Sequence, residues 1–159
     1  MKSDEKNKSP IVIQKRRQAR ELAFQFLYRH FFLTKDLQER NIEHWSLELK
    51  DLGLLHSDES DQSVSDFQLD PFTKELYYSA LSNMEIIDKL IEPLLIGWKM
   101  ERIAKIDHTL LQLGIVEMFF LDEKTPKAVV CNEYVDLSKK YGHKESPAFI
   151  NGILEKITL

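Results

Sequence analysis

Four basic residues near the start of the chain, Lys15, Arg16, Arg17 and Arg20, have the charge and spacing to bind a polyanion. Residues 1–20 hold seven Lys or Arg against two acids, whereas the whole chain has a formal charge of −4. At about 100° per residue, the three arginines share an arc of roughly 100° beside an apolar helix face. Guanidinium groups can fork onto phosphates or stack on bases. The cluster predicts one local nucleic-acid site; a plain charged surface is the alternative.

Two aromatic residues are candidates for contacts with unpaired bases. A helical wheel of the last helix puts Phe149 about 90° from the centre of the apolar stripe, at its rim. Tyr28 lies toward the far side of the first helix from the apolar stripe. A base stacked on a ring contributes roughly 1 to 3 kcal/mol in single-strand binders. For both rings the alternative is packing against the core.

The sequence lacks the patterns typical of catalytic and metal sites. The five glycines and five histidines are scattered, without the spacing of a phosphate loop, a dinucleotide site or a zinc site. Cys131 is the single cysteine, so it has no cysteine partner. The acidic residues at 58–70 lack the glycine and terminal glutamate of a calcium-binding loop. We therefore expect a binding protein that is not an enzyme, with no metal and no cofactor.

The length and composition predict one domain in a reducing compartment. A chain of 159 residues can bury roughly 68 to 70% of its extended surface. A lone cysteine fits a cytoplasmic protein. No apolar run approaches the ~20 residues of a membrane helix, and the polar start lacks the core of a secretion signal. We expect a cytoplasmic protein with no membrane contact.

The hydrophobic pattern divides the chain into helices and loops, with almost no strand signal. Residues 1–13 are expected to form a mobile arm, and residues 53–70 a solvated acidic loop. The expected helices cover residues 15–33, 37–52, 71–91, 107–121, 127–141 and 147–157. Residues 14–159 would form one all-α domain, a compact bundle of six or seven helices.

Capping residues and apolar stripes predict the helix ends and inner faces. The pairs Asp70–Pro71 and Ser146–Pro147 are helix starts, because the first side chain caps free amides and proline suits the first turn. Gly142 is expected to end a helix, and the helix opened by Asp107 is apolar almost all round, as expected of the buried centre. The expected inner faces are Ile42, Trp45, Leu49 and Leu52; Phe72, Leu76, Ala80, Met84, Ile87 and Ile91; and Ala128, Val129, Cys131, Val135 and Leu137.

Three motifs, in order RRQARELAFQFLY, KIDHTLLQLGIVEM and NEYVDLSKKYGHKESPAFINGILEKI, resemble the NusB family of bacterial transcription antitermination factors. The resemblance covers residues 15–33 and 98–157. It implies a compact all-helical fold of two three-helix-like halves. It also implies recognition of single-stranded boxA RNA together with the ribosomal protein NusE, in the transcription elongation complex on ribosomal RNA operons.

The resemblance further implies which residues contact RNA. Carried over by position, they are Lys15, Arg16, Arg17, Arg20, Tyr28, Glu145 and Phe149. The family commonly has aspartate where this chain has Glu145, and an acid beside RNA fits as an acceptor for a base amino group. We expect both ends of the chain to meet on one RNA surface, with arginines on the backbone and rings on unpaired bases.

Two other functions stay open from the sequence. NusB-like modules are also similar to the N-terminal domain of some ribosomal-RNA cytosine methyltransferases, so the chain would be an RNA-binding accessory module. A helical adaptor that binds only protein would need no RNA surface. A modest basic patch on a net-acidic protein predicts weak RNA binding that a protein partner strengthens. A homodimer is a further assembly that the sequence leaves open.

Overall fold

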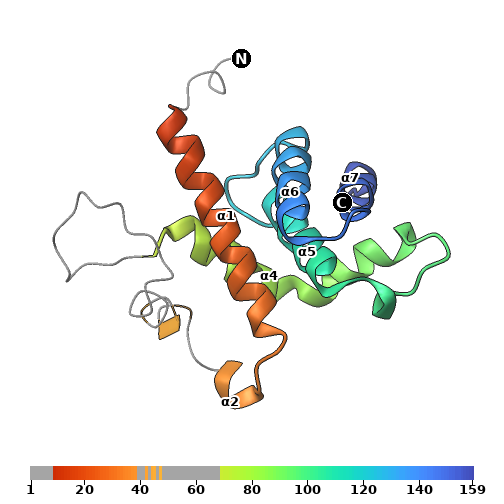
Figure 1. Cartoon of the computed structure of the whole chain (residues 1–159), viewed down its shortest axis with the longest axis horizontal. Coiled ribbons are helices and arrows are strands. Elements are labelled where there is room, and N and C mark those ends of the chain that lie inside the picture. The colour runs from red at the N-terminus through yellow and green to blue at the C-terminus, as the bar shows by residue number, and fades with distance from the viewer. Residues whose placement is uncertain (1–8, 39–41, 43, 46, 48–68) are drawn as a thin grey trace.

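The computed structural model describes residues 9–38, 42, 44, 45, 47 and 69–159, and the regular elements of these residues are all helical (Figure 1). In chain order the α-helices with defined bounds are α1 (Pro10–His30), α2 (Lys35–Gln38), α4 (Pro71–Ile91), α5 (Lys105–Phe119), α6 (Lys127–Tyr141) and α7 (Ser146–Lys156). The 3-10 helices η1 (Glu92–Leu94) and η2 (Met100–Arg102) lie between α4 and α5. The predicted all-α fold is confirmed.

Helix α5 forms the centre of the bundle, as its sequence predicts. Every residue from 109 to 118 is buried, because the helix is apolar on nearly all sides and needs neighbours all round. Helices α6 and α7 pack on α5 and on each other, while α1 and α4 pack together and against α5 (Figure 1). Trp45 is buried with its ring near those of Phe26 from α1 and Tyr77 from α4. None of the described helices has the length and apolarity needed to span a bilayer.

Helix α1 begins at Pro10, which corrects the expectation of an arm over residues 1–13. The Ser9 hydroxyl accepts a hydrogen bond from the Val12 backbone N–H at 3.4 Å, and Pro10 lies in the first turn. The same kind of signal begins α4, where Asp70 Oδ1 accepts from the Phe72 N–H at 2.8 Å. Residues 1–8 of the expected arm and 53–68 of the expected acidic loop lie outside the described residues.

Helix α2 begins at Lys35, two residues before the helix expected over residues 37–52, and most of that range lies outside the described residues. For α1, α5 and α7 the structure shows three further differences. Helix α1 ends at His30 rather than near residue 33. Helix α5 begins two residues before Asp107, which lies in the first turn. Ser146 is the first residue of α7 rather than its cap, since Glu145 has the N-cap position and Ser146 Oγ accepts from the His143 N–H at 2.9 Å.

The apolar faces around residue 45 and on α4 are largely as expected. Ile42 and Trp45 are buried, whereas Leu49 and Leu52 lie outside the described residues. Helix α4 buries its predicted stripe, although Met84 is only half-buried. The buried face of α4 therefore packs against both α1 and α5.

The expected inner face of α6 is wrong at its first positions. Ala128 and Val129 are exposed, and Val135 and Leu137 are half-buried. The residues that α6 does bury are Val130, Cys131, Glu133, Tyr134 and Ser138. The helix is rotated in this way because its acidic and phenolic side chains have partners on α1 and α5.

Candidate nucleic-acid interface

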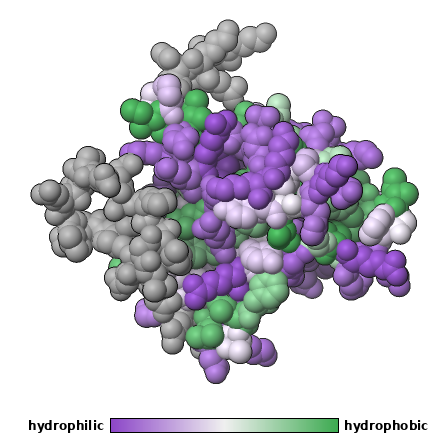
Figure 2. Space-filling model, in the orientation of Figure 1, coloured by the Kyte–Doolittle hydropathy of each residue, from purple (hydrophilic) through white to green (hydrophobic). Residues whose placement is uncertain are grey.

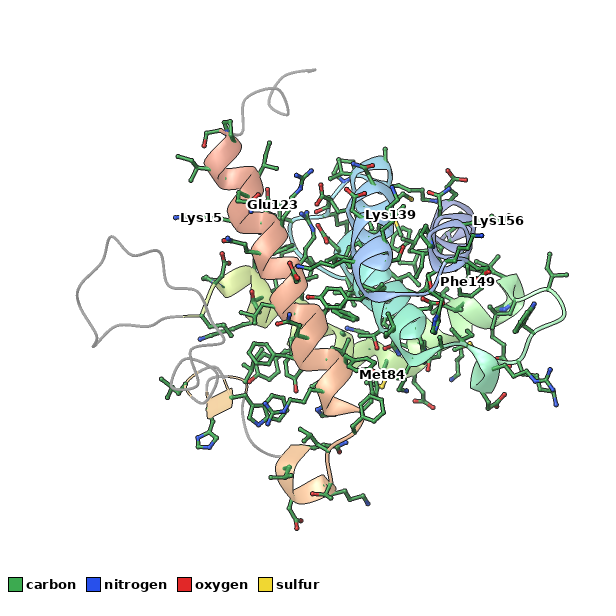
Figure 3. The ribbon with its side chains drawn as sticks, in the orientation of Figure 1. Lys15, Met84, Glu123, Lys139, Phe149 and Lys156 are labelled. Carbon is green, nitrogen blue, oxygen red and sulfur yellow. The ribbon has the colours of Figure 1, made fainter. Side chains whose placement is uncertain are left out.

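The basic residues of α1 lie in three different environments. Lys15 and Arg17 are exposed, Arg16 is half-buried, and Arg20 is only 5% exposed. Lys15 projects from the side of α1 that faces away from α6 (Figure 3). Since α1 crosses the body of the protein, residues one turn further along it lie deeper in the fold. The cationic edge is therefore smaller than its sequence indicates.

Arg20 forms a buried ion pair with Glu117 of α5. Its Nη2 donates to Glu117 Oε1 at 2.6 Å and its Nε to Oε2 at 2.9 Å. The Tyr134 hydroxyl donates to the same carboxylate at 2.9 Å, and Arg20 Nη1 lies 3.7 Å from Glu133 Oε2. A buried charge must be paired in this way, or its desolvation destabilises the fold. The grouping of Arg20 with solvent-facing cations is therefore corrected: its guanidinium joins α1 to α5 and α6.

Arg17 is held at the surface by Glu133 of α6. Its Nε donates to Glu133 Oε2 at 3.0 Å and its Nη2 to Oε1 at 3.1 Å, while half of the Arg17 side chain remains exposed. The hydrogen bond to Glu133 raises the pKa of Arg17, so this group stays cationic. A guanidinium carries five N–H donors in a rigid fork. Glu133 therefore orients Arg17 through Nε and Nη2. The remaining N–H donors of the guanidinium are available to bind a phosphate.

Arg16 lies over an aromatic ring of α4, about 100° around α1 from Arg17. Its guanidinium carbon is 3.8 Å from the centroid of the Phe72 ring, and its Nη2 is 4.0 Å from Glu123 Oε2. A cation above a ring face is attracted by the quadrupole of the ring. Arg16 is therefore oriented by α4 rather than by α6, away from the edge that Arg17 occupies.

Tyr28 belongs to a strip of rings toward the end of α1. Its ring centroid lies 5.9 Å from that of Phe24 and 4.9 Å from that of Phe32, and the Phe24 ring also contacts Tyr141 at 4.9 Å. Tyr28 is half-buried, whereas Phe32 is 64% exposed. The strip begins about two turns of helix beyond Arg17. An RNA strand that contacts both would run along α1.

The C-terminal candidates lie at the start of α7. Glu145 is exposed, and Phe149 is half-buried and packs partly against the core. Phe149 lies on the far side of α6 from α1 in the view of Figure 3. The cations and Phe149 are therefore on elements separated by α6, which forms the middle of any surface they share.

Comparison with known proteins identifies the family. The model of the NusB family matches residues 17–159. This chain belongs to the NusB family. It is 37% identical to transcription antitermination protein NusB of Geotalea daltonii over 143 residues, 89% of this chain and 92% of that protein. It is 38% identical to NusB of Bacillus licheniformis over 108 residues, which cover 67% of this chain and 83% of that protein.

Solved NusB structures share the fold. The T. maritima NusB structure has a TM-score of 0.67 at 26% identity and covers 94% of this chain and 91% of its own. A crystal structure of antitermination factors NusB and NusE in complex with dsRNA has a TM-score of 0.63 at 29% identity. That match covers 89% of this chain and 94% of the solved one. The resemblance stated from the sequence motifs is confirmed.

The NusB match begins at Arg17, so Lys15 and Arg16 precede it. Sequence reasoning missed the acidic partners Glu117 and Glu133, which lie within the second and third motifs. Their signal is a charged residue in an apolar helix, which predicts a buried partner of opposite sign. The exposed ring of Phe32 was missed as well, and nothing in the apolar run around it distinguishes it from core residues.

Proposed function

We propose that this NusB-family chain is an RNA-binding transcription antitermination factor. It recognises boxA-type single-stranded RNA together with the ribosomal protein NusE in the transcription elongation complex, and so supports processive transcription of ribosomal RNA operons. The observation that supports this most is the exposed, pre-oriented guanidinium of Arg17 in a chain whose fold matches a NusB solved with NusE and dsRNA. The proposal assigns no catalytic step to the chain and places it in the cytoplasm, with the nascent transcript.

The proposed RNA contacts divide by chemistry. Lys15, Arg16 and Arg17 neutralise backbone phosphates. Tyr28 and Phe149 offer ring faces to unpaired bases, because both are half-buried and so combine a fixed position with an accessible surface. Glu145 accepts hydrogen bonds from a base amino group. Arg20 is proposed to position α1 on the body of the protein rather than to touch RNA.

The requirement for NusE follows from charge. A chain with a formal charge of −4 repels RNA at long range, and a few local cations offset this only in part. A second protein bound beside the same strand converts part of the interaction into an intramolecular one and raises the apparent affinity. We therefore expect weak binding by the chain alone and tight binding by the heterodimer.

The test is a fluorescence-anisotropy titration of labelled RNA with the full chain, alone and with NusE. A single-stranded boxA-like oligonucleotide is compared with a scrambled strand and with a duplex of the same length, since the related complex contained dsRNA. We expect the boxA-like strand to bind at least tenfold more tightly than the scrambled one in the presence of NusE. Equal affinities for all three RNAs, or no RNA binding with NusE present, would contradict the proposal.

A further inference from the structure

A hollow of about 280 Å³ lies between α1 and α6, beside the exposed edge of Arg17. Hydrophilic side chains gather over this part of the molecule (Figure 2). The lining includes Arg17, Gln18 and Glu21 from α1 and Glu133, Asp136 and Lys140 from α6. With Gln14 and the buried Arg20, the walls combine three cations with three carboxylates and two amides, which is the composition of a polar binding site rather than of a packing defect.

Two cations of the hollow are paired with carboxylates of the opposite helix. Arg17 of α1 pairs with Glu133 of α6, and Lys140 of α6 pairs with Glu21 of α1. The Tyr141 hydroxyl also donates to Glu21, and Gln25 Nε2 donates to the Tyr141 oxygen at 2.9 Å. The positive charge of the hollow is therefore masked by side chains of the protein itself.

The two ion pairs differ in how easily they open. The Glu133 side chain is 10% exposed and also lies 3.7 Å from the buried Arg20, so its movement would remove a carboxylate from two arginines at once. The Lys140 side chain is 61% exposed and Glu21 27%. Exposed lysine–carboxylate pairs are weak and are screened by salt. An incoming anion would therefore displace Glu21 rather than Glu133.

Lys140 and Glu21, the more exposed of the two ion pairs, are both charged at neutral pH. The hydrogen bond to Glu21 raises the pKa of Lys140. Burial raises the pKa of Glu21, but the hydrogen bonds from Lys140 and Tyr141 outweigh it and leave that pKa lowered. Displacing Glu21 thus exchanges one negative partner of Lys140 for another, without a proton transfer.

We propose that this hollow is a phosphate subsite for the RNA backbone, in which Lys140 and the solvent-facing edge of Arg17 bind one phosphodiester and Glu21 is the carboxylate that it displaces. The inference rests on the proposed RNA-binding function and adds α6 to the RNA surface, in the position between α1 and α7. After displacement Glu21 keeps its hydrogen bond from Tyr141. Because every strand must overcome this competition, Glu21 lowers the affinity for all RNA, so that RNA with few other contacts stays largely unbound.

The test compares charge-removing variants of the full chain with labelled boxA-like RNA, in the presence of NusE and over a range of salt. Glu21→Gln keeps an acceptor for Tyr141 but frees Lys140. The matched control is Glu101→Gln, which makes the same charge change at an exposed residue of η2. We expect Glu21→Gln to tighten binding about two- to fivefold, which is the strength of one exposed ion pair. Lys140→Gln should weaken binding and reduce the slope of log K against log salt by about 0.7.

The outcomes separate the subsite from the function. If the unaltered chain binds RNA but Glu21→Gln changes the affinity no more than Glu101→Gln, the phosphate subsite is overturned and the proposed function stands. The same conclusion follows if Lys140→Gln leaves affinity and salt slope unchanged. If the unaltered chain with NusE binds no RNA, the proposed function fails and the subsite fails with it. Thermal melting of each variant checks that the fold is retained.

Discussion

Arg17 and Arg20 lie on nearly the same side of α1, about one turn apart, yet they have different roles. The Arg17 side chain is 50% exposed and that of Arg20 6%. Both form forked hydrogen bonds to a glutamate, but Glu117 is fully buried whereas Glu133 lies at the edge of the hollow. One arginine is thus available to a ligand and the other stabilises the fold.

Replacing Arg20 with alanine should destabilise the protein by about 3 to 5 kcal/mol, because it leaves the Glu117 carboxylate buried without its cation. Arg17→Ala, the matched control, should destabilise the protein much less, since half of the Arg17 side chain is exposed and solvent screens its ion pair. Urea denaturation followed by circular dichroism measures both. A fully stable Arg20→Ala protein would show that the pair is dispensable for folding.

The buried hydroxyl of Tyr77 predicts how the stability of the protein depends on pH. Burial raises the pKa of its hydroxyl to about 12 from the usual value of 10. The unfolded chain therefore loses this proton at lower pH than the folded protein does. Stability should fall as pH rises from 10 to about 12. Thermal melting across this range should show a shallower decline in Tyr77→Phe, and an identical decline would contradict the assignment.

Helix ends depend on short signals that differ in reliability. A capping side chain followed by proline begins α1 at Ser9 and α4 at Asp70, in both cases with a side chain that accepts from a backbone N–H. The same pair at Ser146 and Pro147 lies one position later, inside α7. The difference arises because Ser146 Oγ is taken by the His143 N–H of the preceding turn.

Gly142 permits the tight connection between α6 and α7. A Cβ built on Gly142 would lie 2.6 Å from Ser146 Oγ and 2.8 Å from the Ser138 carbonyl oxygen, and a backbone atom cannot move aside. Its role is close approach, since its φ of −89° is accessible to any residue.

Gly142→Ala should therefore destabilise the protein by about 1 to 3 kcal/mol through overpacking. Gly152→Ala is the control, because a Cβ there meets no atom within 4 Å and the position is helical. That change should stabilise by about 0.5 to 1 kcal/mol, since glycine loses more backbone entropy on folding. Differential scanning calorimetry should show shifts of opposite sign, and equal shifts would contradict the steric explanation.

At the scale of the whole molecule, α1, α5 and α6 are joined by one cluster of charges. Arg17, Arg20, Glu117, Glu133 and Tyr134 connect them through hydrogen bonds between residues far apart in the chain. The cluster sets the orientation of α1, and with it the direction in which Arg17 faces. The position of the proposed RNA contact at Arg17 therefore depends on ion pairs in the interior of the protein.

Removing one exposed cation should change the salt dependence of RNA binding. We expect Arg17→Gln, in the complex with NusE, to weaken affinity and to reduce the slope of log K against log salt by about 0.7. Arg102→Gln on η2 removes the same charge from another exposed position and should have a smaller effect. Titrations at several salt concentrations measure both, and identical slopes for the two variants would exclude Arg17 from the RNA surface.

Local patterns were enough to predict α1, α4, α5, α6 and α7, most of their ends and the buried centre at α5, because apolar periodicity and capping act over a few neighbouring residues. The three sequence motifs were also enough to identify the NusB family. They could not show that Arg20 is buried, since its partner Glu117 lies 97 residues further along the chain. The motifs also could not show that Lys140 pairs with Glu21, which lies 119 residues away in the chain. Which cation faces solvent depends on carboxylates that only the packed helices bring within hydrogen-bond distance.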